Sequence, residues 1–286
     1  MNFTKMQGAG NDFILVEANE SDQNWSRMAV AMCNRHFGIG ADGLLVLLPP
    51  SSADFKMRIF NPDGSEAEAC GNGLRCLVRY VIDRELAKSE VQEISVETVA
   101  GIRKAKISRV KRNSTEIQVG MGEPKFGAKD IPVVIEPEEG SLVDIKSLLS
   151  SHISIGSREL LLHFVSMGNP HAIYFWQYPV SDFPLSQLGP EVEKHNMFPS
   201  RVNFEVAHAL SRQQIETRVW ERGVGETLAC GSGACAVAVA AQLLGYVGNR
   251  IDIKLSGGTL GVEWDGAGEV LLGGPAEIVF TGEWSG

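Results

Sequence analysis

The most constraining feature of this 286-residue sequence is an internal repeat. Adding 160 to a residue number carries R-I-F-N (58–61) onto R-V-W-E (218–221), and A-C-G-N-G (69–73) onto A-C-G-S-G (229–233). The same offset carries Glu66 onto Glu226. One offset therefore covers a strand, a loop and the start of a helix, so we expect two similar halves that arose by duplication.

Segments outside this core repeat extend the same pattern. G-A-G-N-D-F-I (8–14) resembles S-M-G-N-P-H-A-I (166–173), which places Asn11 opposite Asn169 at a nearby offset of 158. Each half closes on a Gly/Pro element, M-G-E-P and G-G-P-A-E, and such elements interrupt regular structure. We therefore expect a boundary near Gly122, with an N-terminal half over 1–121 and a C-terminal half over 122–274.

Hydrophobic periodicity predicts more strands than helices. Short apolar or alternating runs are typical of strands, and they lie at 43–48, 55–60, 116–121, 160–166, 215–220, 251–255 and 277–281. Helical stretches are expected at 25–36, 74–86, 142–149 and 234–244. The elements lack the regular alternation of a doubly wound sheet, which indicates a mixed α/β chain of the α+β type. Residues 234–244 are apolar around the whole helix, so we expect this helix to be enclosed by a sheet.

Composition favours work on a small molecule. The net charge of -9 would on average repel a nucleic-acid backbone or an anionic membrane surface. The sequence shows no signal peptide and no apolar run of spanning length, so we expect a cytoplasmic protein. The five cysteines are an odd number in a long chain, which favours reduced thiols over a disulfide framework. The scattered histidines predict no metal site, and the Gly-x-Gly elements lack a dinucleotide or phosphate-loop pattern, so we expect no cofactor.

The repeat separates two cysteines from the other three. Cys70 and Cys230 each follow a strand and a turn and precede Gly-x-Gly and a helix. The start of a helix offers N–H donors and a positive dipole end, which favour a thiolate or a bound carboxylate. A duplicated pair predicts two thiols that face a shared cleft and invert a carbon centre, one as base and one as acid. Structural roles are expected for the remaining cysteines, which lie inside helical segments: Cys33, Cys76 and Cys235.

The motif series resembles the diaminopimelate epimerase family along nearly the whole chain. The matching motifs, in order, are G-A-G-N-D-F, R-H-F-G-I-G-A-D-G, R-I-F-N-P-D-G-S-E, A-C-G-N-G-x-R-C, S-M-G-N-P-H, R-V-N, W-E-R-G-x-G-E-T and A-C-G-S-G-A-C. The resemblance implies interconversion of LL- and meso-2,6-diaminopimelate without pyridoxal phosphate or metal, in lysine and peptidoglycan precursor synthesis. It also implies a homodimer of chains with two pseudo-symmetric domains, each a barrel-like, mostly antiparallel sheet around a central helix, with the C-terminal strand (275–286) returning to the first domain.

The resemblance also implies roles for individual residues. The catalytic thiols fall on Cys70 and Cys230, and His171 and Glu221 would tune them. The backbone cradle for the reacting carboxylate falls on Gly71, Asn72, Gly231 and Ser232. Contacts to the distal, non-reacting end of the substrate fall on Asn11, Asn61, Asn169, Asn203, Glu221 and Arg222. Some relatives carry glutamine where this chain has Gly43, so Gly43 is left out of the site.

Three other functions are compatible with parts of the pattern. A proline-racemase-like enzyme would share the two-thiol chemistry, but its cyclic substrate offers nothing for the distal-end residues to hold. A thiol-redox protein could cycle a Cys70–Cys230 disulfide. A non-catalytic amino-acid-binding module would use the carboxylate cradle but would gain nothing from paired thiols.

Overall fold

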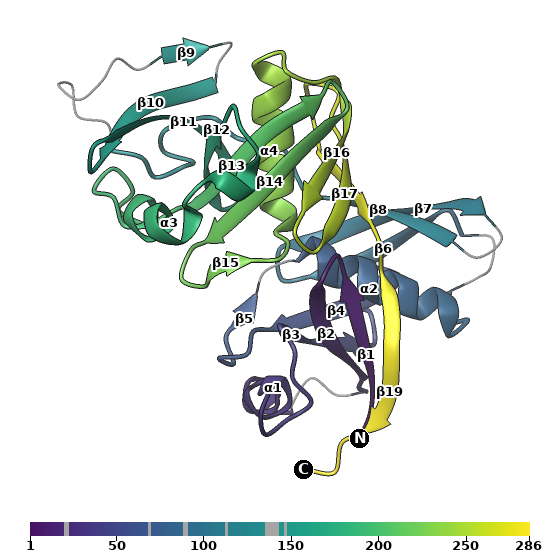
Figure 1. Cartoon of the computed structure of the whole chain (residues 1–286). Helices are drawn as coiled ribbons and strands as arrows, with labels where there is room; N and C mark the ends of the chain where they lie inside the picture. Colours follow the sequence, from purple (N-terminus) through teal and green to yellow (C-terminus); the bar gives the residue numbers. More distant parts are fainter. Residues whose placement is uncertain (20–22, 68–69, 88–90, 112–113, 135–142, 146–147) are drawn as a thin grey trace. The chain divides into compact units, whose positions relative to one another are not determined.

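The computed structural model describes residues 1–19, 23–67, 70–87, 91–111, 114–134, 143–145 and 148–286 (Figure 1). Ala69, the first residue of A-C-G-N-G, lies outside these ranges. The chain divides into two compact units. Unit 1 comprises Met1–Gly120 and Gly273–Gly286, and unit 2 comprises Met121–Leu272.

Unit 1 is a sheet that joins both ends of the chain. Its elements are β1 (Asn2–Gly8), β2 (Asn11–Glu17), α1 (Trp25–Cys33), β3 (Gly43–Leu48), β4 (Phe55–Phe60), β5 (Glu66–Ala67), α2 (Gly71–Asp83), β6 (Glu93–Thr98), β7 (Gly101–Lys111), β8 (Ser114–Gly120) and β19 (Glu277–Glu283). Strand β1 pairs antiparallel with β2 and with β19, which runs beside it in Figure 1. Strand β2 pairs parallel with β3, and β3–β4 and β6–β7–β8 continue antiparallel.

Helix α2 lies at the centre of unit 1. It contacts β1, β2, β3, β4, β7, β8 and β19, and most of its residues are buried. Side chains alternate between the two faces of a strand. Accordingly Leu45 of β3 approaches the first turn of α2, whereas its neighbours Leu44 and Val46 pack in a cluster with Trp25 of α1. The sheet of unit 1 is thus covered by α2 on one face and by α1 on the other.

Unit 2 repeats this arrangement. Its elements are β9 (Val143–Ile145), β10 (Leu148–Ile155), β11 (Arg158–Ser166), β12 (Pro170–Phe175), the 3-10 turn η1 (Val180–Asp182), α3 (Leu185–Glu193), β13 (Asn203–Ser211), β14 (Gln214–Glu221), β15 (Gly225–Thr227), α4 (Gly231–Leu243), β16 (Arg250–Leu255) and β17 (Gly258–Glu263). Strand β18 (Leu271–Gly274) then leads the chain back to unit 1.

The strand registers of the two units correspond residue by residue. In unit 1, Phe13 pairs parallel with Gly43, and Leu45 pairs antiparallel with Ile59. In unit 2, the partners at the repeat offsets make the same pairs: His171 with Asn203 in parallel, and Glu205 with Val219 antiparallel. Helices α2 and α4 also begin and end at equivalent residues, 71–83 and 231–243.

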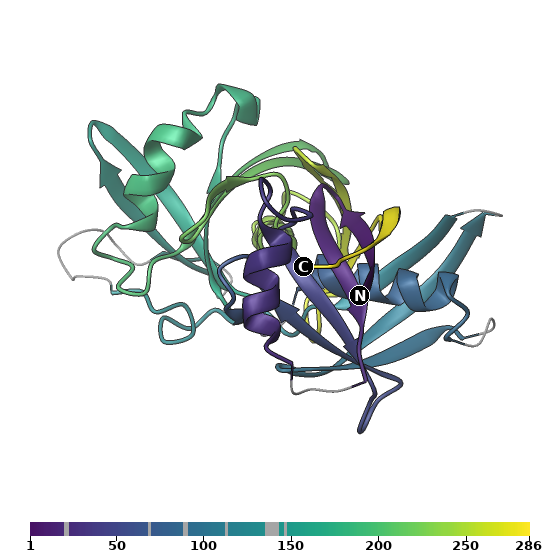
Figure 2. The same ribbon diagram turned by 90° about the horizontal axis from the view of Figure 1, so that it is seen from below.

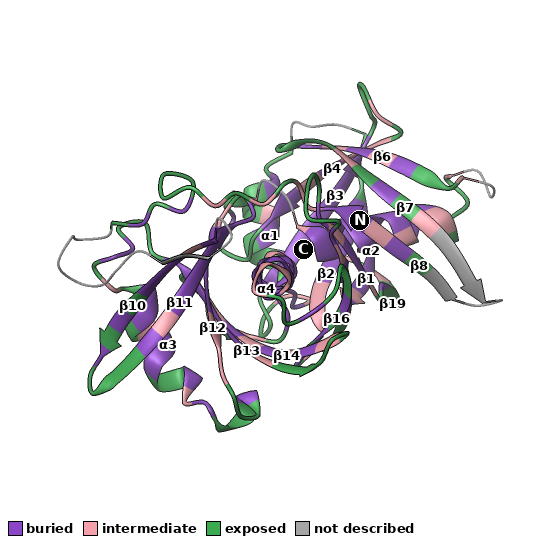
Figure 3. Ribbon diagram, turned by 90° about the horizontal axis from the view of Figure 1, so that it is seen from above, coloured by how far each residue is buried: buried purple, intermediate pink, exposed green. Residues whose placement is uncertain are grey.

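Helix α4 is enclosed, as its apolar sequence predicts. Figures 2 and 3 look along this helix and show strands of unit 2 curving around it. It contacts β11, β12, β13, β16 and β17, and ten of its residues are buried. Its many alanines have little side-chain bulk, which allows the surrounding backbone to approach closely.

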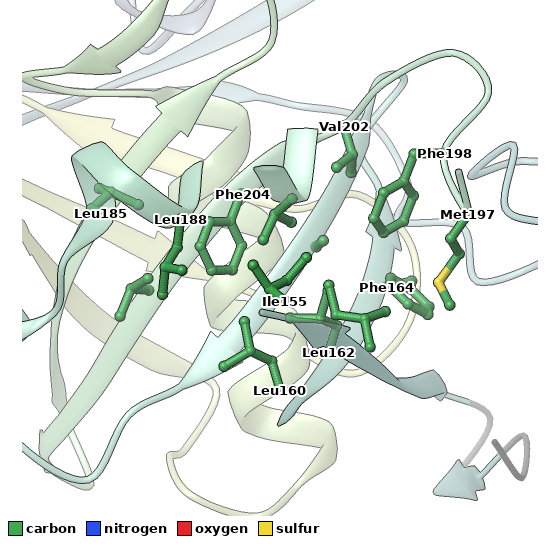
Figure 4. Packing of buried hydrophobic residues seen from close by; sticks show 14 of the residues in the cluster. Ile155, Leu160, Leu162, Phe164, Leu185, Leu188, Met197, Phe198, Val202 and Phe204 are labelled. Atoms are coloured by element: carbon green, nitrogen blue, oxygen red, sulfur yellow. The ribbon is translucent and has the colours of Figure 1, made fainter. Parts of the chain in front are cut away.

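The outer face of the unit 2 sheet is covered by α3. Leu185 and Leu188 of α3 pack with Phe204 and with side chains from β10 and β11 in one buried cluster (Figure 4). Gly189 is required where α3 meets β14, because a Cβ there would lie 2.6 Å from the indole of Trp220.

The mixed α+β class with strands around central helices is confirmed, and the described residues contain four α-helices. The helix predicted at 142–149 is wrong: its described part forms β9 and the start of β10, which pair with each other. Helix α3 was not predicted. Helix α1 ends at Cys33, three residues before its predicted end at residue 36. The Asn34 side chain accepts hydrogen bonds from the N–H groups of His36 and Phe37, and the chain turns there. Within the described ranges, none of the helices has the length and apolar character needed to cross a membrane.

Candidate functional site

The first half-site lies at the start of α2. Cys70 is the N-cap residue in an extended conformation, and its Sγ accepts from the N–H of Gly73 at 3.4 Å. This bond explains why α2 begins at Gly71, three residues before the apolar stripe. Gly71 and Asn72 are buried in the first turn, where N–H groups have no partner within the helix. The thiol therefore lies beside a small set of anion-binding donors.

A directed chain of hydrogen bonds orients the two asparagines of this half-site. Arg75 Nη2 donates to Asn72 Oδ1 at 2.6 Å, so Asn72 Nδ2 is left to donate to Asn11 Oδ1 at 3.2 Å. Asn11 Nδ2 in turn donates to Asp42 Oδ2 at 2.8 Å. A guanidinium only donates and a carboxylate only accepts, so the two ends fix both amide orientations. Asn11 Oδ1 consequently faces Cys70 Sγ, at 3.9 Å.

A cluster of charges holds Asp42 in place. Arg35 binds Asp12 through two nitrogens and also Asp42 at 2.7 Å, while the buried Lys5 ammonium binds Asp12 and the carbonyl of Gly40. Burial raises the pKa of Asp12, but hydrogen bonds from Arg35 and Lys5 outweigh it and hold that pKa well below its usual range. Asp42 thus anchors Asn11 from a rigid, ionised cluster.

The second half-site lies at the start of α4 and has the same backbone. Cys230 is the extended N-cap residue, and its Sγ accepts from the N–H of Gly233 at 3.4 Å. Ser232 Oγ lies 3.5 Å from the same sulfur. Gly231 and Gly233 are buried in the first turn. Cys230 is only 6% exposed, so its thiol is more enclosed than the half-buried thiol of Cys70.

A chain of polar side chains leads away from this second cysteine. Asn169 Nδ2 donates to Ser232 Oγ at 3.3 Å, and Asn169 Oδ1 lies 3.0 Å from His171 Nε2. His171 Nδ1 lies 2.7 Å from Glu205 Oε1. Both members of the His171–Glu205 pair are completely buried. The structure therefore brings together Asn169, His171, Cys230 and Ser232 from the predicted set.

Burial and two nearby carboxylates act together on the Cys230 thiol. Burial raises the pKa of this thiol well above its usual value, and the carboxylates of Glu221 and Glu205 raise it further. The hydrogen bonds with Ser232 and Gly233 act in the opposite direction without reversing the shift. Burial also raises the pKa of Glu221, against hydrogen bonds from Thr227 and Cys230. Burial and the two carboxylates therefore favour the neutral thiol form of Cys230 over the thiolate.

Three of the predicted distal-end residues, Asn61, Asn203 and Arg222, lie at two separate turns. In unit 2, Asn203 Oδ1 accepts from the backbone N–H of Arg222 at 2.8 Å, and Arg222 Nη1 donates to the carbonyl of Ser200 at 3.0 Å. Buried Glu193 holds the same turn through the N–H of Gly223 and the indole of Trp220. In unit 1, exposed Asn61 is bound to Ser65 within its own turn.

Sequence reasoning missed Asp42, Arg75 and Glu205. Asp42 sits in G-A-D-G, which has the composition of a simple turn, and Arg75 lies within a helical stretch. Glu205 lies in an alternating strand, where a charged residue is usually solvent-facing. The repeat contained the signal, because the offset of 160 places Glu205 at the position of Leu45, one of six buried residues in β3. Across the described part of the chain, no three His, Cys, Asp or Glu side chains gather as a metal site would require.

Comparison with solved structures defines the class of fold. The chain is similar to a hydroxyproline epimerase from Agrobacterium vitis with bound trans-4-hydroxy-L-proline, with a TM-score of 0.68 and 16% identity over 99% of this chain and 91% of that one. It is also similar to a Bacillus anthracis phenazine biosynthesis protein of the PhzF family, with a TM-score of 0.70 and 16% identity over 98% and 97% of the two chains. At these identities the likeness shows the fold alone, which this chain shares with both proteins.

Sequence comparison then gives the family. A model described as diaminopimelate epimerase matches residues 3–127 and 163–279. Diaminopimelate epimerases from Pelotomaculum thermopropionicum and Halothermothrix orenii are each 44% identical to this chain, over 99% of it and over 99% and 97% of their own lengths. A third, from Methanococcus maripaludis, is 43% identical over 99% of both chains. The chain belongs to the diaminopimelate epimerase family.

Proposed function

We propose that this protein is a diaminopimelate epimerase, an isomerase that interconverts LL- and meso-2,6-diaminopimelate without a cofactor. The observation that carries the proposal is the pair of cysteines that cap equivalent helices in a chain of this family. In the proposed reaction one cysteine removes the α-proton as a thiolate, and the other cysteine delivers a proton to the opposite face. The product would supply lysine and peptidoglycan precursor synthesis.

The first turns of both helices are proposed to bind the α-carboxylate of the reacting end. Gly71, Asn72, Gly231 and Ser232 would contribute the N–H donors, which also stabilise negative charge as the α-carbon loses its proton. The two cysteines are proposed to exchange the roles of base and acid between the two directions of the reaction.

Arg222 and the asparagines are proposed to hold the distal end of the substrate. A guanidinium binds a carboxylate with two hydrogen bonds, and amide and carboxylate oxygens accept from an ammonium. The set comprises Asn11, Asn61, Asn169, Asn203, Glu221 and Arg222. This requirement distinguishes the substrate from proline, which has no second ammonium and carboxylate.

One assay tests the proposal. The reduced protein is incubated in deuterated water with LL-diaminopimelate or, separately, with L-proline, and exchange of the α-hydrogen and formation of the other isomer are followed. We expect exchange and epimerisation of diaminopimelate alone. Turnover of proline alone would favour the racemase alternative, and absence of both reactions in a folded, reduced protein would exclude two-thiol inversion.

We also propose that the protein is a cytoplasmic homodimer. Three consecutive apolar side chains of β19, Ile278, Val279 and Phe280, are between 40% and 56% exposed on a strand that pairs with β1. Exposed apolar strands are common interaction surfaces. Sedimentation equilibrium of the full chain tests the proposal, and a monomer at all concentrations would contradict it.

A further inference from the structure

Glu205 is a buried acid that the proposed reaction does not yet use. It lies on β13 with no exposed surface, on the strand face that approaches α4. Its Oε1 lies 2.7 Å from His171 Nδ1, and its Oε2 is buried without a hydrogen bond within the described ranges. A buried carboxylate with a single partner costs several kcal/mol in free energy, so its presence calls for an explanation.

The carboxylate lies directly beneath the first turn that Cys230 caps. A Cβ built on Gly233 would lie 2.7 Å from Glu205 Oε1 and 3.4 Å from Cys230 Sγ. The carboxylate oxygen and the sulfur thus border the same small space on the α4 side of the sheet. At this range a second negative charge on the sulfur would be strongly opposed, because little solvent screens the two groups.

The other half-site shows that the fold itself does not require this acid. At the equivalent position in unit 1 the residue is Leu45, and a Cβ on Gly73 would lie 3.0 Å from Leu45 Cδ2. The equivalent of His171 is Phe13, whose ring borders the same space at 3.7 Å. An apolar pair therefore supports the helix start in unit 1, whereas a hydrogen-bonded pair of a carboxylate and an imidazole supports it in unit 2.

We propose that Glu205 is a positioning residue for Cys230: it holds His171 beneath the first turn of α4 and keeps Cys230 in its protonated, proton-donating form. His171, fixed through Nδ1, directs Nε2 to Asn169, and Asn169 reaches Ser232 beside the sulfur. Glu221 is the second carboxylate that acts on the same thiol. The consequence for catalysis rests on the proposed function, whereas the effect on the thiol does not.

Thiol alkylation tests the effect without substrate. The reduced full-length protein is treated with iodoacetamide at one neutral pH, and peptide mass spectrometry gives separate rates for Cys230 and Cys70. Glu205→Gln keeps an acceptor for His171 but removes the charge, so we expect the Cys230/Cys70 rate ratio to rise about tenfold, the size of a one-unit change in thiol pKa. Glu216→Gln is the matched control: Glu216 lies on β14, partly exposed and paired with Lys254, and its loss should leave the ratio unchanged.

An unchanged or lower ratio in Glu205→Gln would overturn the proposal. If that variant does not fold, the double variant H171F/E205L installs the apolar pair that unit 1 already holds, and the same rise in the ratio is expected. For turnover, Glu205→Gln should lower kcat more than it raises KM, because the charge acts on proton delivery. A shifted ratio in a protein that never epimerises diaminopimelate would refute the proposed function alone.

Discussion

The two half-sites have the same backbone geometry but different side chains beneath the cysteine. Each cysteine is an extended N-cap residue, accepts from a glycine N–H at 3.4 Å and precedes a helix of 13 residues. Beneath the helix, unit 1 places Phe13 and Leu45, whereas unit 2 places His171 and Glu205. The duplicated fold thus presents two thiols in equivalent positions, above an apolar pair in unit 1 and a hydrogen-bonded polar pair in unit 2.

The paired asparagines differ in the same way. Asn11 is anchored through its NH2 group by Asp42, so its oxygen faces Cys70. Asn169 Oδ1 lies 3.0 Å from His171 Nε2, and the NH2 group of Asn169 donates to Ser232. One half-site therefore offers an acceptor and the other a donor.

Removal of either thiol should have the largest effect. Cys70→Ser and Cys230→Ser are each expected to lower kcat for epimerisation by about 10²- to 10⁴-fold, because a serine hydroxyl is a far weaker acid–base group at neutral pH. Cys76→Ser should retain activity and lose stability, because Cys76 is buried in α2 and burial raises its pKa to about 12. Equal catalytic losses in all three variants would contradict the assignment of Cys70 and Cys230.

As pH falls, the folding stability of unit 2 should decrease at a higher pH than that of unit 1. Burial lowers the pKa of His163 in unit 2 to about 4, so between the ordinary value of 6.5 and that pH the unfolded chain binds a proton that the folded chain does not. Stability therefore falls as pH drops through this window, by about 3 kcal/mol in total. The depressed pKa of Asp12 in unit 1 acts only at lower pH, where the unfolded aspartate gains its proton first.

Hydrogen exchange followed by mass spectrometry measures the two units separately. Peptides from β10 and β11 should lose protection between pH 6.5 and 4, and peptides from β1 and β2 should not, after correction for intrinsic exchange rates. His163→Gln provides the control, because glutamine does not titrate and has both a donor and an acceptor with which to replace the hydrogen bond between His163 and Ser150. The assignment of the acid sensitivity to His163 would be contradicted if both units lost protection together, or if unit 2 still lost protection in the His163→Gln variant.

Substitution of alanine for the equivalent residues Gly73 and Gly233 should have the smallest effect on stability. The change in unfolding free energy should differ between the two variants. In Gly233→Ala the new Cβ lies 2.7 Å from the carboxylate of Glu205, and we expect a loss of about 1–3 kcal/mol in unfolding free energy. In Gly73→Ala it meets the flexible end of Leu45 at 3.0 Å, and the better helix propensity of alanine, worth about 1 kcal/mol, offsets the contact. Urea unfolding measures both variants, and equal losses would show that the two helix starts are equally packed.

Much of this fold could be predicted because the repeat and the strand patterns are local properties of the sequence. The run at 55–60 was predicted with its observed bounds as β4, and the enclosed helix at 234–244 differs from α4 mainly at its start. The start was missed because a cysteine that accepts a backbone hydrogen bond is a rare N-cap residue. The helix predicted at 142–149 was wrong because the pairing of β9 with β10 outweighs local propensity, which is a weak guide for short segments.

The less predictable part of the site is the set of residues that act on the thiols from beneath and beside them. Helix α3 was missed because Gly189 and Pro190 lie inside it, although Gly189 serves close packing on Trp220. The roles of Glu205 and Asp42 depend on hydrogen bonds to partners that are distant in sequence, His171 and Asn11, so a local pattern does not predict them. A single strand pattern does not report which face a charged residue occupies, whereas comparison of the two halves does.

The pairing of β19 with β1 has a consequence for synthesis on the ribosome. Unit 2 is one continuous segment, Met121–Leu272, and its strands can pair as soon as that segment has emerged. Unit 1 must wait, because its first strand remains without β19 until residues 277–283 have been made. The first strand of the chain therefore depends on the last, and one edge of β1 has no partner until β19 has been made.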